Sequence, residues 1–88
     1  MNTLFDHRET SDRYRGELFR QGDYRVILCR GGIQWIIQRR KKGAAARWRS
    51  LGYCTTRKSL IRLWASENCA MCAELTALPG TVREATHG

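Results

Sequence analysis

Residues 24–64 decide the fold, and they read YRVILCRGGIQWIIQRRKKGAAARWRSLGYCTTRKSLIRLW. Val, Ile, Tyr and Trp concentrate in three runs of this stretch, as they do in β-strands, and turn-forming residues separate the runs. The last part instead spaces its apolar residues at helical intervals. The pattern predicts an α+β fold: a small antiparallel three-stranded sheet, with room for a fourth short strand at Leu18-Phe19, packed on one face by one or two C-terminal helices.

The pair Gly31-Gly32 sets the expected register of the first hairpin, because two glycines suit a tight turn that needs positive φ. With those two residues as the loop, the pairs on the core side are Leu28–Trp35, Val26–Ile37 and Tyr24–Arg39. The pairs on the other side are Arg25–Gln38, Ile27–Ile36 and Cys29–Gln34. That second face has an apolar centre within polar and cationic groups, so we expect it to be open to a partner.

Residues 47–53 are predicted to form the third strand, in which Arg49, Leu51 and Tyr53 share one face and Trp48 and Ser50 share the other. Gly52 is expected to mark a bulge or a close approach. Thr55 or Thr56 is a favoured helix N-cap. The helix that follows should lay one apolar side on the core face of the sheet, through Leu60, Ile61, Leu63 and Trp64.

The remaining residues are assigned by their polarity. Residues 1–23 are predicted to be a polar N-terminal arm, and residues 24–78 a single domain. Asn68 is expected to end the first helix and to cap a second helix that runs to Leu78. Pro79-Gly80 ends that helix, and residues 79–88 are predicted to be a flexible tail.

Charge is segregated along the chain. The net charge is +8, yet residues 25–66 hold eleven Arg or Lys and no Asp or Glu, while the flanks carry all eight acids. A field of one sign favours a polyanionic partner such as nucleic acid or a nucleoprotein, although a basic surface that only aids solubility is the alternative. No apolar run approaches the roughly 20 residues that span a bilayer, and the first residues lack a signal-peptide core. We therefore expect a cytoplasmic protein with no membrane partner and no small-molecule substrate, and a dimer is one expected state.

The strongest candidates for binding are basic. Arg and Lys on a hairpin neutralise phosphates, and cations in a first helical turn oppose the helix dipole, a cost that a bound anion would reverse. Together with the second face of the sheet, the predicted binding residues are Arg25, Ile27, Ile36, Gln38, Arg39, Arg40, Lys41, Lys42, Arg47, Trp48, Arg49, Arg57 and Lys58.

Cys69 and Cys72 form a C-x-x-C pair. Zinc would require a second close pair or a nearby His, and His7 and His87 lie at the termini. Buried thiols that act as small apolar side chains are the favoured interpretation, so neither a metal nor a cofactor is expected.

Catalytic groups are sparse, because residues 25–66 contain no His and no carboxylate. Acid–base chemistry therefore lacks its usual groups, which predicts a protein that is not an enzyme. A ribonuclease toxin that works with Tyr24, Arg49 and Tyr53 is the enzymatic alternative.

Five short motifs occur in order: residues 33–39 (IQWIIQR), Lys42-Gly43, Arg47-Trp48, Leu51-Gly52-Tyr53, and a Thr before a helix. This half of the chain resembles the three-strand-plus-helix DNA-binding domain of plant ethylene-response factors and phage integrase arms. The resemblance implies a sheet that enters the major groove, with contacts from Arg25, Trp35, Arg39, Arg47, Trp48 and Arg49. The chain departs from the family in Ile27 and Cys29 on its first strand, and in the basic residues Arg57, Lys58 and Arg62 of its helix.

The chain is also similar in style to small basic proteins of phages and mobile elements, some of which are anti-CRISPR proteins. We therefore predict a binding module of phage or mobile-element type that binds DNA or a nucleoprotein complex that handles nucleic acid. The alternative within this class is an anti-CRISPR inhibitor, which would bind a CRISPR effector complex and block its DNA binding. The Ile27–Ile36 pair keeps that protein-directed alternative open, since protein interfaces use apolar contacts as well as charge.

Overall fold

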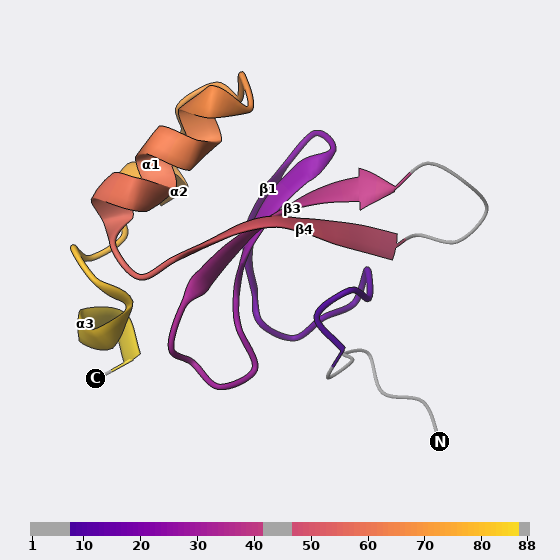
Figure 1. Cartoon of the computed structure of the whole chain (residues 1–88), viewed down its shortest axis with the longest axis horizontal. Helices are drawn as coiled ribbons and strands as arrows, with labels where there is room; N and C mark the ends of the chain where they lie inside the picture. Colours follow the sequence, from indigo (N-terminus) through magenta and orange to yellow (C-terminus); the bar gives the residue numbers. More distant parts are fainter. Residues whose placement is uncertain (1–7, 42–46, 87–88) are drawn as a thin grey trace.

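A computed structural model describes residues 8–41 and 47–86. Within them the chain forms a four-stranded antiparallel sheet in the order β1-β2-β3-β4, followed by three helices (Figure 1). The elements are β1 (Glu17–Gln21), β2 (Tyr24–Leu28), β3 (Trp35–Lys41), β4 (Arg47–Cys54), α1 (Arg57–Ser66), α2 (Ala73–Thr76) and α3 (Val82–Thr86). The predicted α+β class is confirmed, and β1 is the fourth strand for which the sequence left room. None of these three helices combines the length and the apolar character that a membrane-spanning helix requires.

The β2–β3 hairpin has the predicted register. The facing pairs are Tyr24–Arg39, Arg25–Gln38, Val26–Ile37, Ile27–Ile36 and Leu28–Trp35. The turn differs in detail from the expected two-glycine loop. The Gly32 N–H donates to the Cys29 carbonyl oxygen at 2.9 Å, and Gly32, but not Gly31, has a positive φ, of 69°.

The main core lies between the sheet and α1, as predicted. Leu60 and Trp64 of α1 are both 0% exposed, and they pack with Val26 and Ile37 of the sheet. Phe19 of β1 places its ring edge-on to the Trp64 ring, with 5.5 Å between the ring centres. The helix begins where the sequence indicated: the side-chain oxygen of the N-cap, Thr56, accepts the Ser59 N–H at 3.2 Å.

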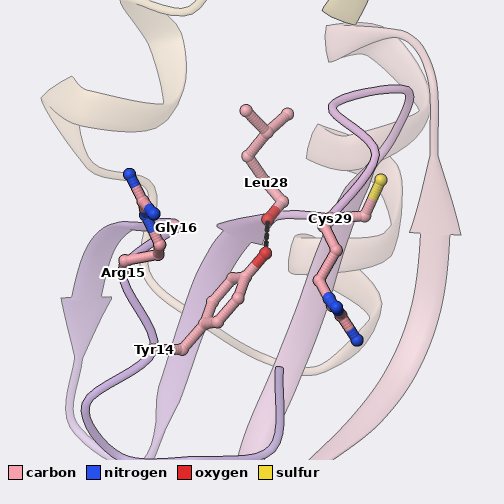
Figure 2. Close-up of a pocket in the computed structure, with 6 residues that line it drawn as sticks. Tyr14, Arg15, Gly16, Leu28 and Cys29 are labelled. Carbon is pink, nitrogen blue, oxygen red and sulfur yellow. Dashed lines mark hydrogen bonds between the residues drawn. The ribbon is translucent and has the colours of Figure 1, made fainter. Parts of the chain in front are cut away.

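The second face of the sheet is covered rather than open. Tyr14, Ile27, Cys29 and Ile36 form a separate buried cluster, in which Tyr14 comes from the N-terminal segment. The Tyr14 hydroxyl donates to the Leu28 carbonyl oxygen at 2.8 Å (Figure 2). The expectation of an exposed Ile27–Ile36 pair was wrong, because residues 8–16, which we call the N-terminal strap, supply the groups that cover it.

The strap is also tied to the far edge of the sheet. The backbone N–H of Trp48 donates to the Thr10 carbonyl oxygen at 3.0 Å, and Ser11 forms a β-bridge with Arg47 of β4. The strap therefore reaches from β2 to β4. The strap is held against the sheet by backbone hydrogen bonds as well as by the Tyr14 side chain.

The folded unit extends beyond residues 24–78 on both sides, which corrects the predicted arm and tail. β1 pairs with β2 from Glu17–Ile27 to Gln21–Tyr24, so residues 17–21 belong to the sheet. Val82 of α3 is 1% exposed, and its N–H donates to the Thr55 carbonyl oxygen at 2.9 Å. Residues 1–7 and 87–88, which hold the rest of the predicted arm and tail, lie outside the described residues.

The second helix is shorter than expected. Asn68 follows α1 with a φ of 62°, a left-handed conformation that Asn tolerates, so it does not cap a helix. The N-cap of α2 is Cys72 instead, and α2 ends at Thr76. Leu75 of α2 is fully buried in the main core, so even this single turn contributes to packing.

A bulge in β4 changes which side chains share a face. Ile37 pairs with Gly52 while Gln38 pairs with Ser50, so Leu51 is the extra residue. The alternation is therefore reversed after Leu51, and Tyr53 faces Ile36 on the strap side. The predicted grouping of Tyr53 with Arg49 and Leu51 was wrong for this reason. Gly52 marks a close approach as well as the bulge, because a Cβ there would collide with the side chain of Leu63 in α1.

Candidate polyanion-binding surface

Exposed positive charge gathers where β3 ends and β4 begins. The residues concerned, which we call the hairpin surface, are Arg39, Arg40, Lys41, Arg47 and Arg49, and all are exposed. Four of them, with Asp23, line an open pocket of about 450 Å³. Lys42, the other cation predicted here, lies outside the described residues. Of the predicted binding residues, these five are brought together by the sheet.

The sheet register places like charges directly opposite each other on the hairpin surface. Arg39 pairs with Arg49, and Lys41 pairs with Arg47. Directly opposite residues have Cβ atoms roughly 4.5–5.5 Å apart, and like charges at that separation destabilise a sheet. Two such pairs at one end are a cost to folding that a bound polyanion would offset.

The cations of the hairpin surface have few partners inside the protein. Across residues 8–41 and 47–86, the ion pairs involve Arg20 and Arg25 and none of these five. The guanidinium of Arg39 lies 5.6 Å from the centre of the Tyr24 ring, and that of Arg40 lies 6.0 Å from the Trp48 ring. Such cation–π contacts orient an Arg without neutralising it, so the positive charge stays available at the surface.

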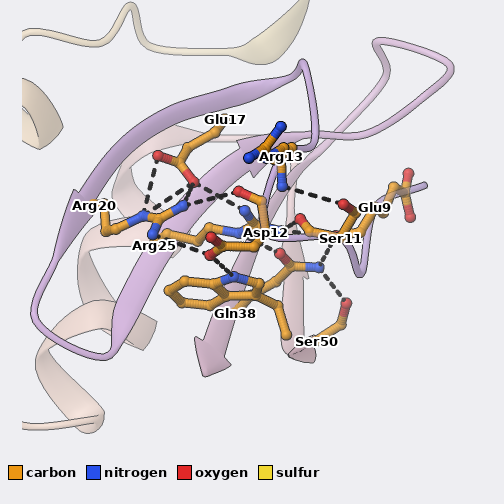
Figure 3. A network of polar contacts seen from close by, with 10 residues as sticks. Glu9, Ser11, Asp12, Arg13, Glu17, Arg20, Arg25, Gln38 and Ser50 are labelled. Carbon is orange, nitrogen blue, oxygen red and sulfur yellow. Dashed lines mark hydrogen bonds and ion pairs between the residues drawn. The ribbon is translucent and has the colours of Figure 1, made fainter. Parts of the chain in front are cut away.

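Arg25, also predicted to bind a partner, is instead 0% exposed. Its guanidinium donates to Glu17 Oε1 at 2.9 Å and to Gln38 Oε1 at 2.7 Å (Figure 3). It also donates to the backbone carbonyl oxygens of Glu9 and Ser11, at 2.9 and 2.8 Å. Arg25 therefore binds the strap to the sheet, and its hydrogen-bonding capacity is used inside the protein.

Gln38 completes the same buried network. Its amide nitrogen donates to the Glu9 carbonyl oxygen at 2.9 Å and to Ser50 Oγ at 3.1 Å. The residue is 0% exposed. Among the described residues, no buried side-chain nitrogen or oxygen is left without a hydrogen bond, so the network is fully satisfied and adds rigidity to the sheet.

Trp48 lies at the centre of this network rather than at the surface, because it is 1% exposed. Its indole N–H donates to Asp12 Oδ1 at 2.9 Å, and this hydrogen bond, with the nearby Arg20, holds the pKa of Asp12 below its ordinary value. The guanidinium groups of Arg20 and Arg25 lie 4.9 and 4.4 Å from the Trp48 ring centre. Trp48, which was predicted as a binding contact, is thus part of the packing.

Glu17 forms two ion pairs in the network, and Asp12 forms another with Arg20. Glu17 Oε1 lies 2.7 Å from Arg20 Nη2 and 2.9 Å from Arg25 Nη1. Partial burial raises the pKa of Glu17, but the hydrogen bonds from Arg20 and Arg25 outweigh burial and lower the pKa overall. Glu17 therefore stays ionised and balances the charge of the buried Arg25.

The prediction that the second face of the sheet is open to a partner was wrong. Five predicted binding residues are buried: Arg25, Ile27, Ile36, Gln38 and Trp48. The sequence held one signal of this arrangement. Glu9, Asp12 and Glu17 lie just before an acid-free basic stretch, with the apolar Tyr14 among them. Acids at that place are suited to pair with arginines of the neighbouring strand.

The start of α1 is separate from the hairpin surface. Figure 1 shows α1 on the other side of the molecule from the end of β3 and the start of β4. Arg57 is half-buried, and its Nη1 donates to the Leu78 carbonyl oxygen at 2.6 Å. Lys58 is exposed. The structure therefore does not join these two residues to the main basic site.

The four cysteines are free thiols. Cys29 and Cys54 are buried in the two cores, while Cys69 and Cys72 are half-buried. Burial raises the pKa of the Cys54 and Cys69 thiols, which disfavours the reactive thiolate. Among residues 8–41 and 47–86, no group of three or more His, Cys, Asp or Glu side chains could hold a metal ion.

The residues suggested for a ribonuclease do not form one site. Tyr24 packs against the main core and faces Arg39, whereas Tyr53 pairs with Ile36 on the strap side. The two tyrosines therefore lie on opposite faces of the sheet. This separation comes from the bulge at Leu51, which turns Tyr53 away from Arg49.

No protein-family model matches the chain, and neither a curated protein nor a solved structure matches it. The resemblance to the DNA-binding domains of ethylene-response factors and integrase arms therefore stays a prediction.

Proposed function

We propose that this protein is a non-enzymatic module that binds the phosphate backbone of DNA through the hairpin surface. The observation that carries the proposal is the pairing of Arg39 with Arg49 and of Lys41 with Arg47. A sequence selected for stability alone would place an acid opposite each cation. DNA phosphates would supply the missing negative charge.

The position of the five cations on two paired strands supports this function. All five belong to the paired strands β3 and β4, so their backbone positions are fixed before binding. Hydrogen bonds of Arg25 and Gln38 stabilise the same two strands on the face that the strap covers. Rigid placement lowers the entropy lost when charged side chains meet phosphates.

Free DNA is a better partner for this surface than an effector protein. The protein-directed alternative depended on an exposed Ile27–Ile36 pair, and both residues are buried. Among residues 8–41 and 47–86, the exposed large apolar residues lie on separate elements: Leu18 on β1, Ile33 before β3, Tyr53 on β4 and Met71 before α2. Scattered single side chains of this kind need no partner to explain them.

A salt series tests the proposal. Fluorescence anisotropy with a labelled duplex, between about 50 and 200 mM salt, should give an affinity that falls by a slope of about 0.9 per phosphate contacted. Arg47→Ala and Arg49→Ala should each reduce that slope by about 1. The matched control is Arg62→Ala, which removes the same charge from the exposed side of α1.

Two results would overturn the proposal. One is a wild-type protein that does not bind duplex DNA at the low end of the salt series. The other is an Arg62→Ala variant that weakens binding as much as Arg49→Ala, since this would show a response to net charge alone. An effect of the hairpin variants with an unaffected Arg62→Ala control supports a defined surface.

A further inference from the structure

A carboxylate lies beside the cations of the hairpin surface. Asp23, in the turn between β1 and β2, lines the same open pocket of about 450 Å³ as Arg39, Arg40, Lys41 and Arg49. Its side chain is exposed. A negative charge in this pocket repels the phosphates that the cations attract, because like charges at short distance oppose each other.

The backbone around Asp23 is held in place. The Arg40 N–H donates to the Asp23 carbonyl oxygen at 2.7 Å, which fixes the turn against β3. The turn itself is tight, because Gln21 pairs with Tyr24 and Gly22 has a positive φ of 59°, a conformation that favours glycine. The carboxylate of Asp23 therefore stays near the pocket as long as the sheet is folded.

The negative charge of Asp23 is not used inside the described part of the protein. Across residues 8–41 and 47–86, the ion pairs belong to the carboxylates of Asp12 and Glu17, and none includes Asp23. A carboxylate that served only to stabilise the sheet would pair with one of the arginines around the pocket. A phosphate that entered the pocket would instead meet an unpaired negative charge.

The pocket divides the cations of the hairpin surface into two groups. Both members of the Arg39–Arg49 pair line it together with Asp23, whereas Arg47 does not. The guanidinium of Arg39 also lies 5.6 Å from the ring centre of Tyr24, the residue that follows Asp23 in the chain. A phosphate held by Arg39 and Arg49 therefore lies nearer to Asp23 than one held by Arg47.

We propose that Asp23 limits the affinity of the hairpin surface for DNA, by weakening the phosphate contacts of Arg39 and Arg49 but not those of Arg47. This inference rests on the proposed function. Two unit charges about 6 Å apart in water interact strongly enough to change a binding constant by about threefold, and a lower effective dielectric constant near the protein increases that factor. The consequence is faster release, because affinity changes within one interface act mainly on dissociation.

The variant Asp23→Asn tests this role, because asparagine keeps the shape of the side chain and removes its charge. In anisotropy with a labelled duplex at about 50 mM salt, it should bind about three to ten times more tightly than wild type, and added salt should reduce the gain. Glu74→Gln is the matched control, since Glu74 is an exposed acid of α2 that lies outside the pocket. It should raise the affinity by less than about twofold, because charges beyond a Debye length are screened.

A double-mutant cycle shows whether the effect of Asp23 is local. In an Arg39→Ala/Arg49→Ala background, Asp23→Asn should lose most of its effect, because the contacts that Asp23 weakens are already absent. In an Arg47→Ala background, the gain should be the same as in the wild type. All these proteins are compared at one low salt concentration.

Tighter binding by Asp23→Asn that depends on Arg39 and Arg49 and is absent from Glu74→Gln supports the inference. Three results would overturn it. The first is an Asp23→Asn protein that binds no more tightly than wild type. The second is an equal gain in Glu74→Gln, and the third is an equal gain in the Arg39→Ala/Arg49→Ala and Arg47→Ala backgrounds, since each would show a response to net charge alone.

Elution from a phosphocellulose column separates this inference from the proposed function, because the column presents phosphates without DNA. If the wild-type protein binds no duplex, the proposed function fails. Elution of Asp23→Asn at a higher salt concentration than wild type and Glu74→Gln would still support Asp23 as a limit on phosphate binding, and equal elution would overturn it. If the wild-type protein binds duplex and Asp23→Asn binds equally tightly, this inference alone fails and the hairpin surface stands.

Discussion

Arg25 and Arg49 are the same residue type on the same sheet, yet their surroundings differ completely. Arg25 is 0% exposed and donates to Glu17, to Gln38 and to two carbonyl oxygens of the strap. Arg49 is exposed, faces another Arg and forms no ion pair with the described residues. Positive charge alone therefore does not indicate a binding residue: the position of the strap divides structural arginines from available ones.

Replacing Arg25 should show the largest effect. Arg25→Ala leaves Glu17, Gln38 and the strap carbonyl groups without their buried donor, so we expect the free energy of unfolding to fall by about 3–5 kcal/mol. Urea denaturation followed by tryptophan fluorescence measures this loss. Arg49→Ala is the matched control, and it should leave stability unchanged or slightly raised. Equal losses in the two variants would contradict the division between the two arginines.

The complementary change is the double variant Arg39→Ala/Arg49→Ala. It removes one like-charge pair from the hairpin surface, so duplex affinity should drop by about tenfold or more at low salt while the fold is kept. Anisotropy gives the affinity and circular dichroism the fold. A double variant that binds duplex DNA as tightly as the wild type would show that Arg39 and Arg49 are exposed to solvent but do not contact DNA.

Acid should weaken the strap before it affects the hairpin surface. The pKa values of Asp12 and Glu17 lie below their ordinary values of 3.8 and 4.5. Carboxylates with lowered folded-state pKa values contribute stability that is complete above about pH 5 and is lost as the pH falls through the folded values. Glu17→Gln should therefore be less stable than wild type at neutral pH and should lose less stability on acidification, as denaturant midpoints at pH 7 and pH 3 would show.

The smallest expected effect is a gain. Arg49→Glu places an acid opposite Arg39, so the unfolding free energy should rise by about 0.5 kcal/mol while duplex binding weakens. A thermal melt and the salt series together test both halves. A less stable Arg49→Glu protein would mean that the like-charge pair is not a folding cost, which would weaken the case for a missing anionic partner.

Local patterns were sufficient for much of the fold. Alternating apolar residues around Gly31-Gly32 predicted the β2–β3 register. Helix signals predicted the apolar side of α1 and an N-cap at Thr55 or Thr56, and the N-cap is Thr56. These features depend on neighbours in sequence, where residue type and conformation are tightly linked. The candidate site was predicted in part: the charges of the hairpin surface were identified, whereas Arg25, Gln38 and Trp48 were assigned to a surface that does not exist.

Local residue patterns are enough to predict the charge field, the hairpin register and the place of α1. Which cations are available depends instead on long-range contacts, because the strap holds Arg25 through the backbone carbonyl groups of Glu9 and Ser11. Every residue has such a carbonyl group, so residue type carries no signal of this contact.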